Sequence, residues 1–306
     1  MKQATRALIS KVLKQSETSL LKKSHVVGVG IGEKIKDGKP TGRMSLKVYV
    51  ERKIAKEKLS KSDLVTPTIS EVETDVEEVG KIRPLASNRM RTRPAGGGSS
   101  IGHYQITAGT LGCLVKDKKS GKTLILSNNH VLANSNKAKK GDAIIQPGAA
   151  DGGKVEGDTI AELERWVKIG FGKLTNTVDA AVALPLNEKD VSPEISSIGN
   201  PKGTTQAKEG QIVQKTGRTT DHTLGEIKDI HATVRVEYDG KAALFRNQIL
   251  TSAMSQGGDS GSLVLDPKRR AVGLLFAGSD RVTLCNPIQE VFRLLGIHLK
   301  ISHFPT

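Results

Sequence analysis

A serine set among glycines is the part of this sequence that most directly suggests chemistry. Residues 256–262 read Gln-Gly-Gly-Asp-Ser-Gly-Ser, with Ser260 between two apolar runs. The glycines let the backbone turn sharply and bring main-chain N–H groups near the hydroxyl. Such N–H groups can stabilise the charge that develops on an attacked carbonyl, as in an oxyanion hole. The alternative interpretation is a glycine-rich turn that carries a serine by chance.

A serine hydroxyl becomes a good nucleophile only when a base takes its proton and a third group orients that base. His130 comes directly after the strand-like run at residues 124–127, which places it at a predicted strand end. Asp179 opens the apolar run at residues 180–185, so we expect it to be buried and to need a cationic partner. The alternatives are a structural histidine bonded to nearby backbone and an aspartate that only begins a strand at a turn.

The elements that must position these residues are short strands. From residue 106 onward, runs of Val, Ile, Leu and Thr alternate with turns at short intervals, and an amphipathic helix is predicted over residues 288–295. So many strands suit a mainly β fold of two packed Greek-key β-barrels.

A small basic α+β domain is predicted before the barrels. Apolar residues at helical spacing over residues 8–13 indicate an amphipathic helix packed on its own domain, with a membrane-surface helix as the alternative. A hairpin is predicted over residues 25–50 and another strand over residues 69–79. Glycines alternate over residues 28–32, which indicates close packing, because no helix start follows to receive a phosphate.

The predicted domain boundary is rich in arginine, proline and glycine. Residues 94–100 read Pro-Ala-Gly-Gly-Gly-Ser-Ser and follow several arginines, so no regular structure is expected there. We therefore predict an N-terminal domain at 1–83, a linker at 84–105 and a β domain at 106–306. An exposed basic linker would also be a site for proteolytic nicking.

The net charge of +15 is concentrated near the start of the 306 residues. Residues 1–94 hold 21 Lys and Arg against 11 Asp and Glu. Such a region could bind nucleic acid or an anionic surface. Aromatic residues are scarce there and its lysines alternate with glutamates, as on a solvated face, which makes nucleic-acid binding the weaker alternative.

Cysteine usage and apolar patterning bear on the compartment. No apolar run approaches the ~20 residues of a membrane span, and basic residues interrupt the start where a secretory signal would lie. We therefore expect a cytoplasmic protein. Cys113 and Cys285 lie in apolar runs and fit a reduced compartment, although a bridge between them stays open. No metal-ligand spacing or phosphate loop is found, so no cofactor is expected, and the oligomeric state is not predicted.

The order His130, Asp179, Ser260 and the segments around these residues resemble a chymotrypsin-like serine peptidase, in particular the bacterial kind typified by α-lytic protease and the streptogrisins. The resemblance covers about residues 106–297. It rests on Gly-Asp-Ser-Gly at 258–261, the strand-His motif at 127–132, Asp-Ala-Ala-Val-Ala at 179–183, Lys-Thr-Gly-Arg-Thr-Thr at 215–220 and Thr-Leu-Cys-Asn-Pro-Ile at 283–288. It implies protein or peptide substrates.

The resemblance implies a catalytic triad. Ser260 would attack the scissile carbonyl, His130 would act as general base and then general acid, and Asp179 would orient the imidazole. The backbone N–H groups of Gly258 and Ser260 would form the oxyanion hole.

The resemblance also implies a buried anion, Asp259, beside the nucleophile. In the bacterial group an internal arginine neutralises this residue, and Arg218 matches that arginine. We therefore expect an Asp259–Arg218 ion pair. Two departures from the family pattern, Asn128-Asn129 before the histidine and Ser262 after the motif, could alter the cleft.

The specificity pocket implied by the resemblance has Met254 at its floor. Phe276, Ala277 and Gly278 would belong to the strand that pairs with the substrate backbone, and Thr283 would stand on the wall. Since none of these residues pairs a cation, a small or medium apolar side chain is predicted before the scissile bond.

These observations favour an active serine endopeptidase. Its N-terminal domain could be an inhibitory pro-segment, a substrate-recruiting module or a partner adaptor. The alternatives are a pseudo-peptidase that uses intact barrels for binding, and nucleic-acid binding by the basic N-terminal part.

Overall fold

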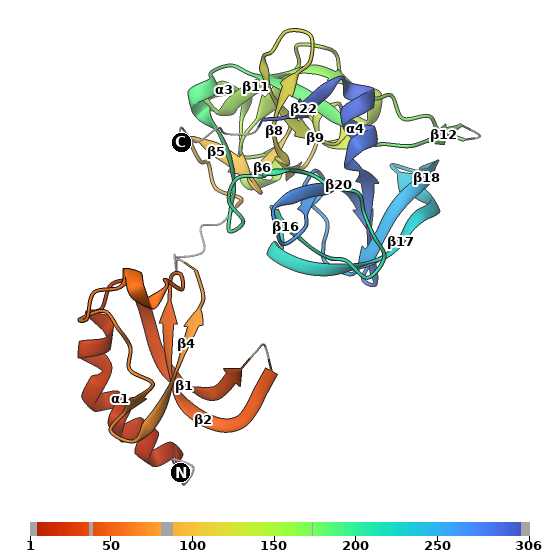
Figure 1. Ribbon diagram of the computed structural model, residues 1–306. Coiled ribbons are helices and arrows are strands. Elements are labelled where there is room, and N and C mark those ends of the chain that lie inside the picture. Colours follow the sequence, from red (N-terminus) through yellow and green to blue (C-terminus); the bar gives the residue numbers. More distant parts are fainter. Residues whose placement is uncertain (1–4, 37–38, 81–87, 173, 301–306) are drawn as a thin grey trace. The chain divides into compact units, whose positions relative to one another are not determined.

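The computed structural model describes residues 5–36, 39–80, 88–172 and 174–300. The chain divides into two units, Met1–Leu85 and Ala86–Thr306 (Figure 1). No helix among the described residues is long and apolar enough to cross a membrane.

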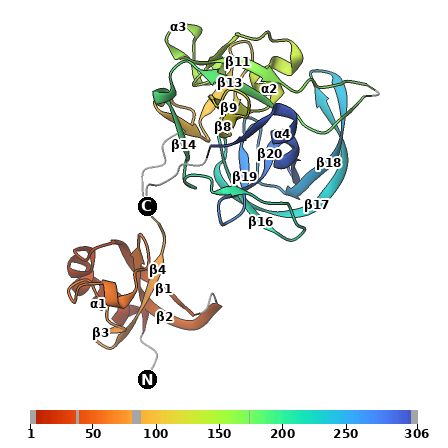
Figure 2. The same ribbon diagram turned by 45° about the horizontal axis from the view of Figure 1, so that its top comes forward.

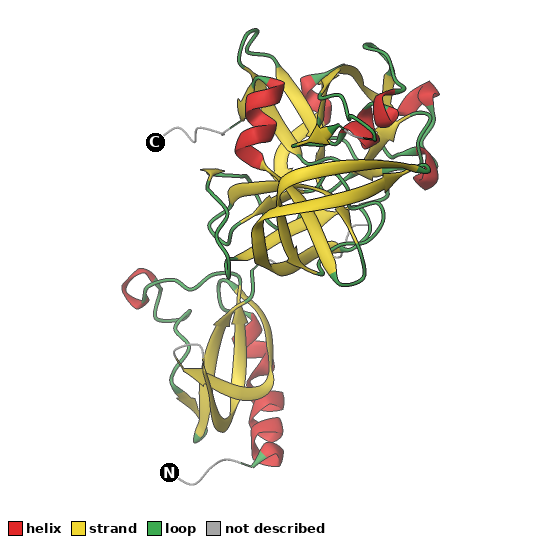
Figure 3. Cartoon of the chain, turned by 90° about the vertical axis from the view of Figure 1, so that its right-hand side faces the viewer, coloured by secondary structure: helices red, strands yellow, loops and turns green. Residues whose placement is uncertain are grey.

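The first unit is a four-stranded sheet with one helix against it (Figure 3). The helix buries Ile9, Val12 and Leu20 with apolar residues of the sheet, so it packs on its own domain as predicted. The strands follow the order β1-β2-β4-β3. The elements are α1 (Arg6–Leu21), β1 (Val26–Lys36), β2 (Lys39–Val50), the 3₁₀ helix η1 (Lys56–Lys58), β3 (Thr68–Ile69) and β4 (Val72–Glu78).

Two of the three alternating glycines of β1, Gly28 and Gly30, lie against the ring of Tyr49, and the third, Gly32, lies against the side chain of Lys47. A Cβ atom on Gly28 or Gly30 would lie 3.4 or 3.3 Å from atoms of that ring. The prediction of close packing in this strand is therefore confirmed.

The second unit contains two barrel-like sheets, which confirms the predicted mainly β, chymotrypsin-like architecture (Figure 2). In the first sheet the order is β22-β8-β9-β13-β11-β10-β6-β7. Its strands are β6 (Ser100–His103), β7 (Gly109–Thr110), β8 (Cys113–Asp117), β9 (Thr123–Ser127), β10 (Ala143–Ile145), β11 (Thr159–Trp166), β13 (Ala181–Pro185) and β22 (Ile297–Leu299). The short helices along this part of the chain are α2 (Asn129–Leu132), η2 (Asn134–Asn136), η3 (Ala149–Asp151), α3 (Val155–Asp158) and η4 (Glu188–Asp190).

The second sheet closes on itself. Six strands pair in the ring β16-β17-β18-β21-β20-β19, and β19 returns to β16. β12 and β15 extend it at β18 and β20. The strands are β12 (Thr175–Asn176), β15 (Gly203–Thr204), β16 (Ile212–Gly217), β17 (Asp221–Tyr238), β18 (Lys241–Ser252), β19 (Leu263–Leu265), β20 (Arg270–Gly278) and β21 (Val282–Pro287). The helix α4 (Ile288–Leu295) follows β21 and buries its apolar face in the core shared with the first sheet.

The predicted linker is wrong over most of its length. Residues 81–87 lie outside the described residues, but the chain from Asn88 onward belongs to the second unit. There it forms β5 (Ala95–Gly97), which pairs with β14 (Val191–Ile195), and the buried strand β6. The glycines are needed for close approach: a Cβ on Gly96 would lie 2.2 Å from the carbonyl oxygen of Glu194. A glycine run that indicated flexibility is therefore a packed strand.

Candidate active site

His130 and Asp179 are brought together by neighbouring strands. β9 runs into α2, which carries His130, and β13 follows Asp179; the two strands pair at Ser127 and Ala181. Nδ1 of His130 lies 2.6 Å from Oδ2 of Asp179, and the backbone N–H of His130 donates to Oδ1 at 3.2 Å. Asp179 is fully buried, as its place before an apolar strand predicted.

Further polar groups hold the backbone of Asp179. Its N–H donates to Oδ1 of Asn286 at 2.9 Å, and its carbonyl oxygen accepts from Nδ2 of Asn128 at 2.7 Å. The unusual Asn128 thus helps to fix the carboxylate. The hydroxyl of Tyr238 also donates to Oδ2 of Asp179 at 2.9 Å, a contact that sequence reasoning missed.

The loop that carries Ser260 depends on two glycines with positive φ. Gly258 and Gly261 both have φ of 98°. A Cβ on Gly261 would lie 2.1 Å from Oγ of Ser127, so no larger residue fits there. Thr110 ties the loop to the first sheet, since its hydroxyl donates to the carbonyl of Gly258 and its N–H donates to the carbonyl of Ser260, each at 2.8 Å.

Several backbone N–H groups of this loop have no hydrogen-bond partner within the described part of the chain. They include those of Gly258 and Ser260, the pair predicted to form the oxyanion hole, and also that of Gly257, whereas the N–H groups of Asp259 and Gly261 donate to backbone carbonyls. Unpaired donors beside a serine hydroxyl are what stabilisation of an oxyanion requires.

The hydroxyl of Ser260 is directed to a backbone carbonyl. It donates to the carbonyl of Phe276 at 3.4 Å, and no hydrogen bond joins Ser260 to His130 among the residues that the structure describes. Contacts between nucleophile and base are often long before substrate binds.

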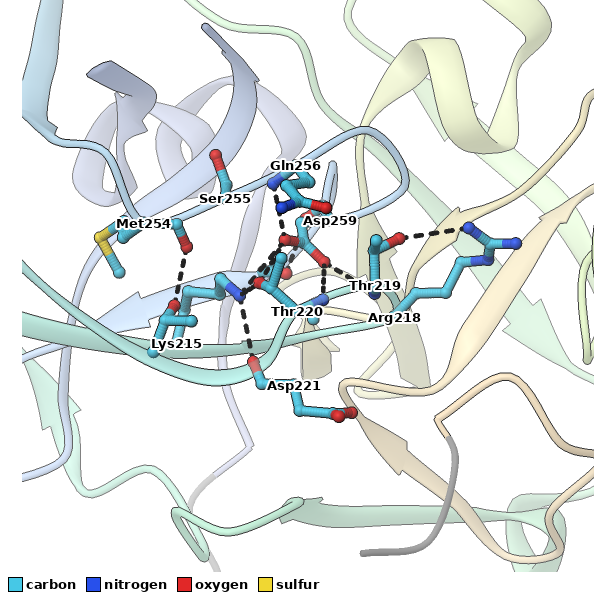
Figure 4. Close-up of polar contacts among 12 residues, drawn as sticks. Lys215, Arg218, Thr219, Thr220, Asp221, Met254, Ser255, Gln256 and Asp259 are labelled. Atoms are coloured by element: carbon cyan, nitrogen blue, oxygen red, sulfur yellow. Dashed lines mark hydrogen bonds and ion pairs between the residues drawn. The ribbon is translucent and has the colours of Figure 1, made fainter. Parts of the chain in front are cut away.

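The prediction that Arg218 pairs with Asp259 is wrong. Asp259 lies 3.3 Å from Nζ of Lys215, and both side chains are 0% exposed (Figure 4). The carboxylate also accepts the N–H groups of Thr219 and Thr220 at 2.8 and 3.1 Å. Burial lowers the pKa of Lys215, and the attraction of Asp259 offsets part of that effect. An internal lysine therefore takes the place expected for the arginine.

The network around Asp259 joins the serine loop to the turn between β16 and β17. Oδ2 of Asp259 accepts from the hydroxyl of Thr220 at 2.6 Å and from the N–H of Gln256 at 3.0 Å (Figure 4). The Lys215 ammonium donates to the Thr220 hydroxyl and, at 3.0 Å, to the carbonyl of Asp221. A Cβ at position 217 would lie 2.4 Å from Oδ1 of Asp259, so Gly217 makes room for the carboxylate.

Arg218 pairs instead with Asp151, another residue that sequence reasoning missed because it stands in an Asp-Gly-Gly turn. Nε and Nη2 of Arg218 donate to the two carboxylate oxygens at 2.5 and 2.6 Å. The hydroxyl of Ser100 donates to the same carboxylate at 2.6 Å. Burial acts to raise the pKa of Asp151, but the bonds from Arg218 and Ser100 hold it below its usual value. Through Asp151, Arg218 is thus linked to Ser100 in β6 of the first sheet.

A cleft of about 650 Å³ opens beside Ser260. Of the residues predicted to bind substrate, Met254, Ala277 and Gly278 line it. Asp280 lines it too, an exposed carboxylate that was not anticipated. Its other lining residues are Thr220, Thr223, Ala253, Ser255, Gln256, Gly257, Leu275 and Ser279.

Phe276 and Thr283 do not line the cleft but adjoin or contact residues that do. The hydroxyl of Thr283 accepts the N–H of Met254 at 3.1 Å and lies 2.7 Å from that of Ser255. The ring of Phe276 packs on Phe245 with the two centroids 4.8 Å apart. These two residues therefore shape the lining segments without lining the cleft.

The two cysteines are free and buried. Burial raises the pKa of each thiol, that of Cys113 and that of Cys285, to about 12. Neither forms the bridge that the sequence left open, and both behave as small core residues.

Comparisons with solved structures support the fold. The comparison with curated proteins found no similar sequence. Among solved structures, Protease A of Thermobifida fusca is 18% identical, with 68% of this chain and 98% of that chain covered and a TM-score of 0.50. Nocardiopsis protease is 18% identical, with 67% and 98% covered and a TM-score of 0.51. At such identities these two matches speak for the fold alone.

A family model described as the trypsin-like peptidase domain matches residues 109–274, which include His130, Asp179 and Ser260. This stretch is more than half of the 306 residues. The chain belongs to the trypsin-like peptidase family.

Proposed function

We propose that the protein is a serine endopeptidase that works through Ser260, His130 and Asp179. The observation that carries the proposal is the 2.6 Å contact between His130 and the buried Asp179 carboxylate. A buried carboxylate in this contact fixes the ring orientation and stabilises the imidazolium that forms during catalysis. The unpaired N–H groups of Gly258 and Ser260 add support.

The proposed reaction proceeds in two steps. Oγ of Ser260 rotates from the Phe276 carbonyl toward His130, gives its proton to Nε2 and attacks the scissile carbonyl, whose oxyanion accepts the N–H groups of Gly258 and Ser260. The amine leaves with the proton from His130. Water, activated by the same imidazole, then hydrolyses the acyl-enzyme, and Ser260 recovers its proton.

A fluorophosphonate probe tests this function, because it reacts with an activated serine. We expect a covalent adduct on Ser260 that is absent in Ser260→Ala and strongly reduced in His130→Ala. A folded wild-type protein that acquires no adduct would contradict the proposal.

The second candidate is a pseudo-peptidase that binds peptides without cleaving them. The specific observation in its favour is that Ser260 bonds to the Phe276 carbonyl and not to His130. This candidate predicts peptide binding in the cleft with no fluorophosphonate adduct and no hydrolysis.

For the N-terminal unit we propose a regulatory role in the same peptidase. If it is a pro-segment, purified protein should lose its residues up to about position 87 on storage, and Ser260→Ala protein should not. Mass spectrometry of the shortened chain measures the cut. Equal stability of both proteins would favour a recruiting or adaptor module.

A further inference from the structure

Tyr238 contacts the His130–Asp179 pair from the second sheet. Its hydroxyl donates to Oδ2 of Asp179 at 2.9 Å, the same oxygen that lies 2.6 Å from Nδ1 of His130. Its ring stands edge-on to the imidazole with the centroids 5.8 Å apart. We propose that Tyr238 is a positioning residue of the active site, which holds the Asp179 carboxylate in the orientation that His130 requires. Its catalytic consequence rests on the proposed function.

The hairpin of β17 and β18 places the Tyr238 side chain next to Asp179. Tyr238 pairs with Lys241 across the two-residue turn Asp239-Gly240, whose φ values are 45° and 78°. Positive φ at both positions is typical of the type I′ turn, which fixes the register of a hairpin. Bulges along the hairpin bend the two long strands, which curve along one side of the unit (Figure 2). The tip of the hairpin therefore lies next to Asp179, which precedes β13 of the first sheet.

The tip of the hairpin is tied to the segments that precede Asp179 and follow His130. The N–H of Gly172 donates to the carbonyl of Ala242 at 3.1 Å, and β12 pairs with β18. Nζ of Lys137 lies 3.3 Å from Oδ2 of Asp239 at the surface. The exposed ion pair adds little stability, but the backbone contacts hold the tip in place.

Aromatic packing fixes the ring of Tyr238. Phe171 lies edge-on to it at 6.0 Å between centroids, and Phe245 lies 6.2 Å away. Together with Phe276, these residues are four of the nine Phe, Tyr and Trp residues in the whole chain. A protein with so few aromatic residues concentrates them around one tyrosine. This tyrosine is 9% exposed and donates to a buried carboxylate.

The chemistry of the contact requires Tyr238 to stay protonated. Burial, and then the negative charge of Asp179, raise the pKa of Tyr238 above its usual value, so the hydroxyl remains a donor throughout the working pH range. A donor to a carboxylate stabilises the ionised form and spreads its charge. Charged side chains at the hairpin tip include Asp239, which pairs with Lys137, and Lys241, whose Nζ lies 5.8 Å from the Phe171 ring centroid.

Tyr238→Phe removes the hydroxyl and keeps the ring. Asp179 would then lose the donor that fixes its Oδ2 atom, and His130 would be held less firmly. We expect kcat to fall about tenfold with KM nearly unchanged, because the buried hydroxyl does not line the cleft. Tyr104→Phe, which removes a tyrosine hydroxyl elsewhere in the same unit, should leave both quantities unchanged.

A readout without turnover separates this inference from the proposed function. The NMR resonance of the His130 Nδ1 proton, followed in the full chain, should change its chemical shift in Tyr238→Phe even if the protein hydrolyses nothing, because both groups bond to the same carboxylate oxygen. In the Asp179→Asn background, Tyr238→Phe should cause less than a twofold further loss of fluorophosphonate labelling. An unchanged Nδ1 proton resonance in a folded Tyr238→Phe protein, or a full tenfold loss in the Asp179→Asn background, would overturn the assignment. Absence of labelling in the wild type would refute only the peptidase.

Discussion

Replacing Lys215 by methionine tests the support of the serine loop. The substitution keeps the length of the buried side chain and removes its ammonium. Asp259, which is 0% exposed, would then be a buried carboxylate without its cation, although four hydrogen-bond donors would remain. The loop that presents the N–H groups of Gly258 and Ser260 would lose the charge that anchors it.

The size of the effect follows from the burial of both partners. Removing one member of a buried ion pair costs about 3–5 kcal/mol. For a unit of this size, that loss corresponds to a fall in Tm of about 6–20 °C. We expect Lys215→Met to show such a fall and to slow fluorophosphonate labelling of Ser260 at least tenfold at temperatures where it remains folded.

Two further variants identify the cause. Lys215→Met with Asp259→Asn removes both charges and should recover part of the lost Tm. Arg218→Ala removes a neighbouring cation that pairs with Asp151, so it should lower Tm while labelling stays within a fewfold of the wild type. Scanning calorimetry and labelling rates measure both effects. A Lys215→Met protein with wild-type Tm and labelling, or an Arg218→Ala protein that alone loses labelling, would refute the reasoning.

Other predictions address the nucleophile, the pH range, the thiols and specificity. Ser260→Ala should lower turnover of a peptide substrate by about 10⁶-fold, measured with a chromogenic assay. Because burial lowers the pKa of Lys215 from 10.5, labelling of Ser260 should decline as pH rises through a value below 10.5; a rate that stays flat to pH 11 would contradict the role of the ammonium. Cys113 and Cys285, with pKa values raised to about 12, should react with a disulfide reagent at pH 8 only after unfolding, and rapid reaction of native protein would show an opening of the core. Leucyl and alanyl substrates should be cleaved faster than arginyl ones. If arginyl substrates are cleaved faster instead, and this preference disappears in Asp280→Ala, the Asp280 carboxylate determines the selectivity.

The sequence predicted the residues whose neighbours lie close along the chain. His130 and Asp179 each adjoin an apolar strand, so their burial and their place at strand ends could be inferred. The glycines around Ser260 likewise predicted a tight loop. These local signals were sufficient for the fold class and for a candidate nucleophile.

Contacts between distant segments could not be predicted in the same way. The motif at residues 215–220 located a cation near Asp259 but not which one. Lys215 follows the buried Val213 at the spacing of inward-facing strand positions, and that alternation was the available signal. Arg218 comes after the end of β16 and turns to Asp151 instead. The role of Tyr238 depends on the length and curvature of a hairpin, which no local pattern encodes.

Asn88, near the start of the second unit, contacts the turn that supports the loop of Ser260. Nδ2 of Asn88 donates to the carbonyl of Gly217 at 3.0 Å and to Oδ1 of Asp221 at 2.8 Å. These two residues flank the turn whose N–H groups hold Asp259. Asn88 therefore helps to fix the turn that holds Asp259, and Asn88→Ala would loosen the support of the loop that carries Ser260.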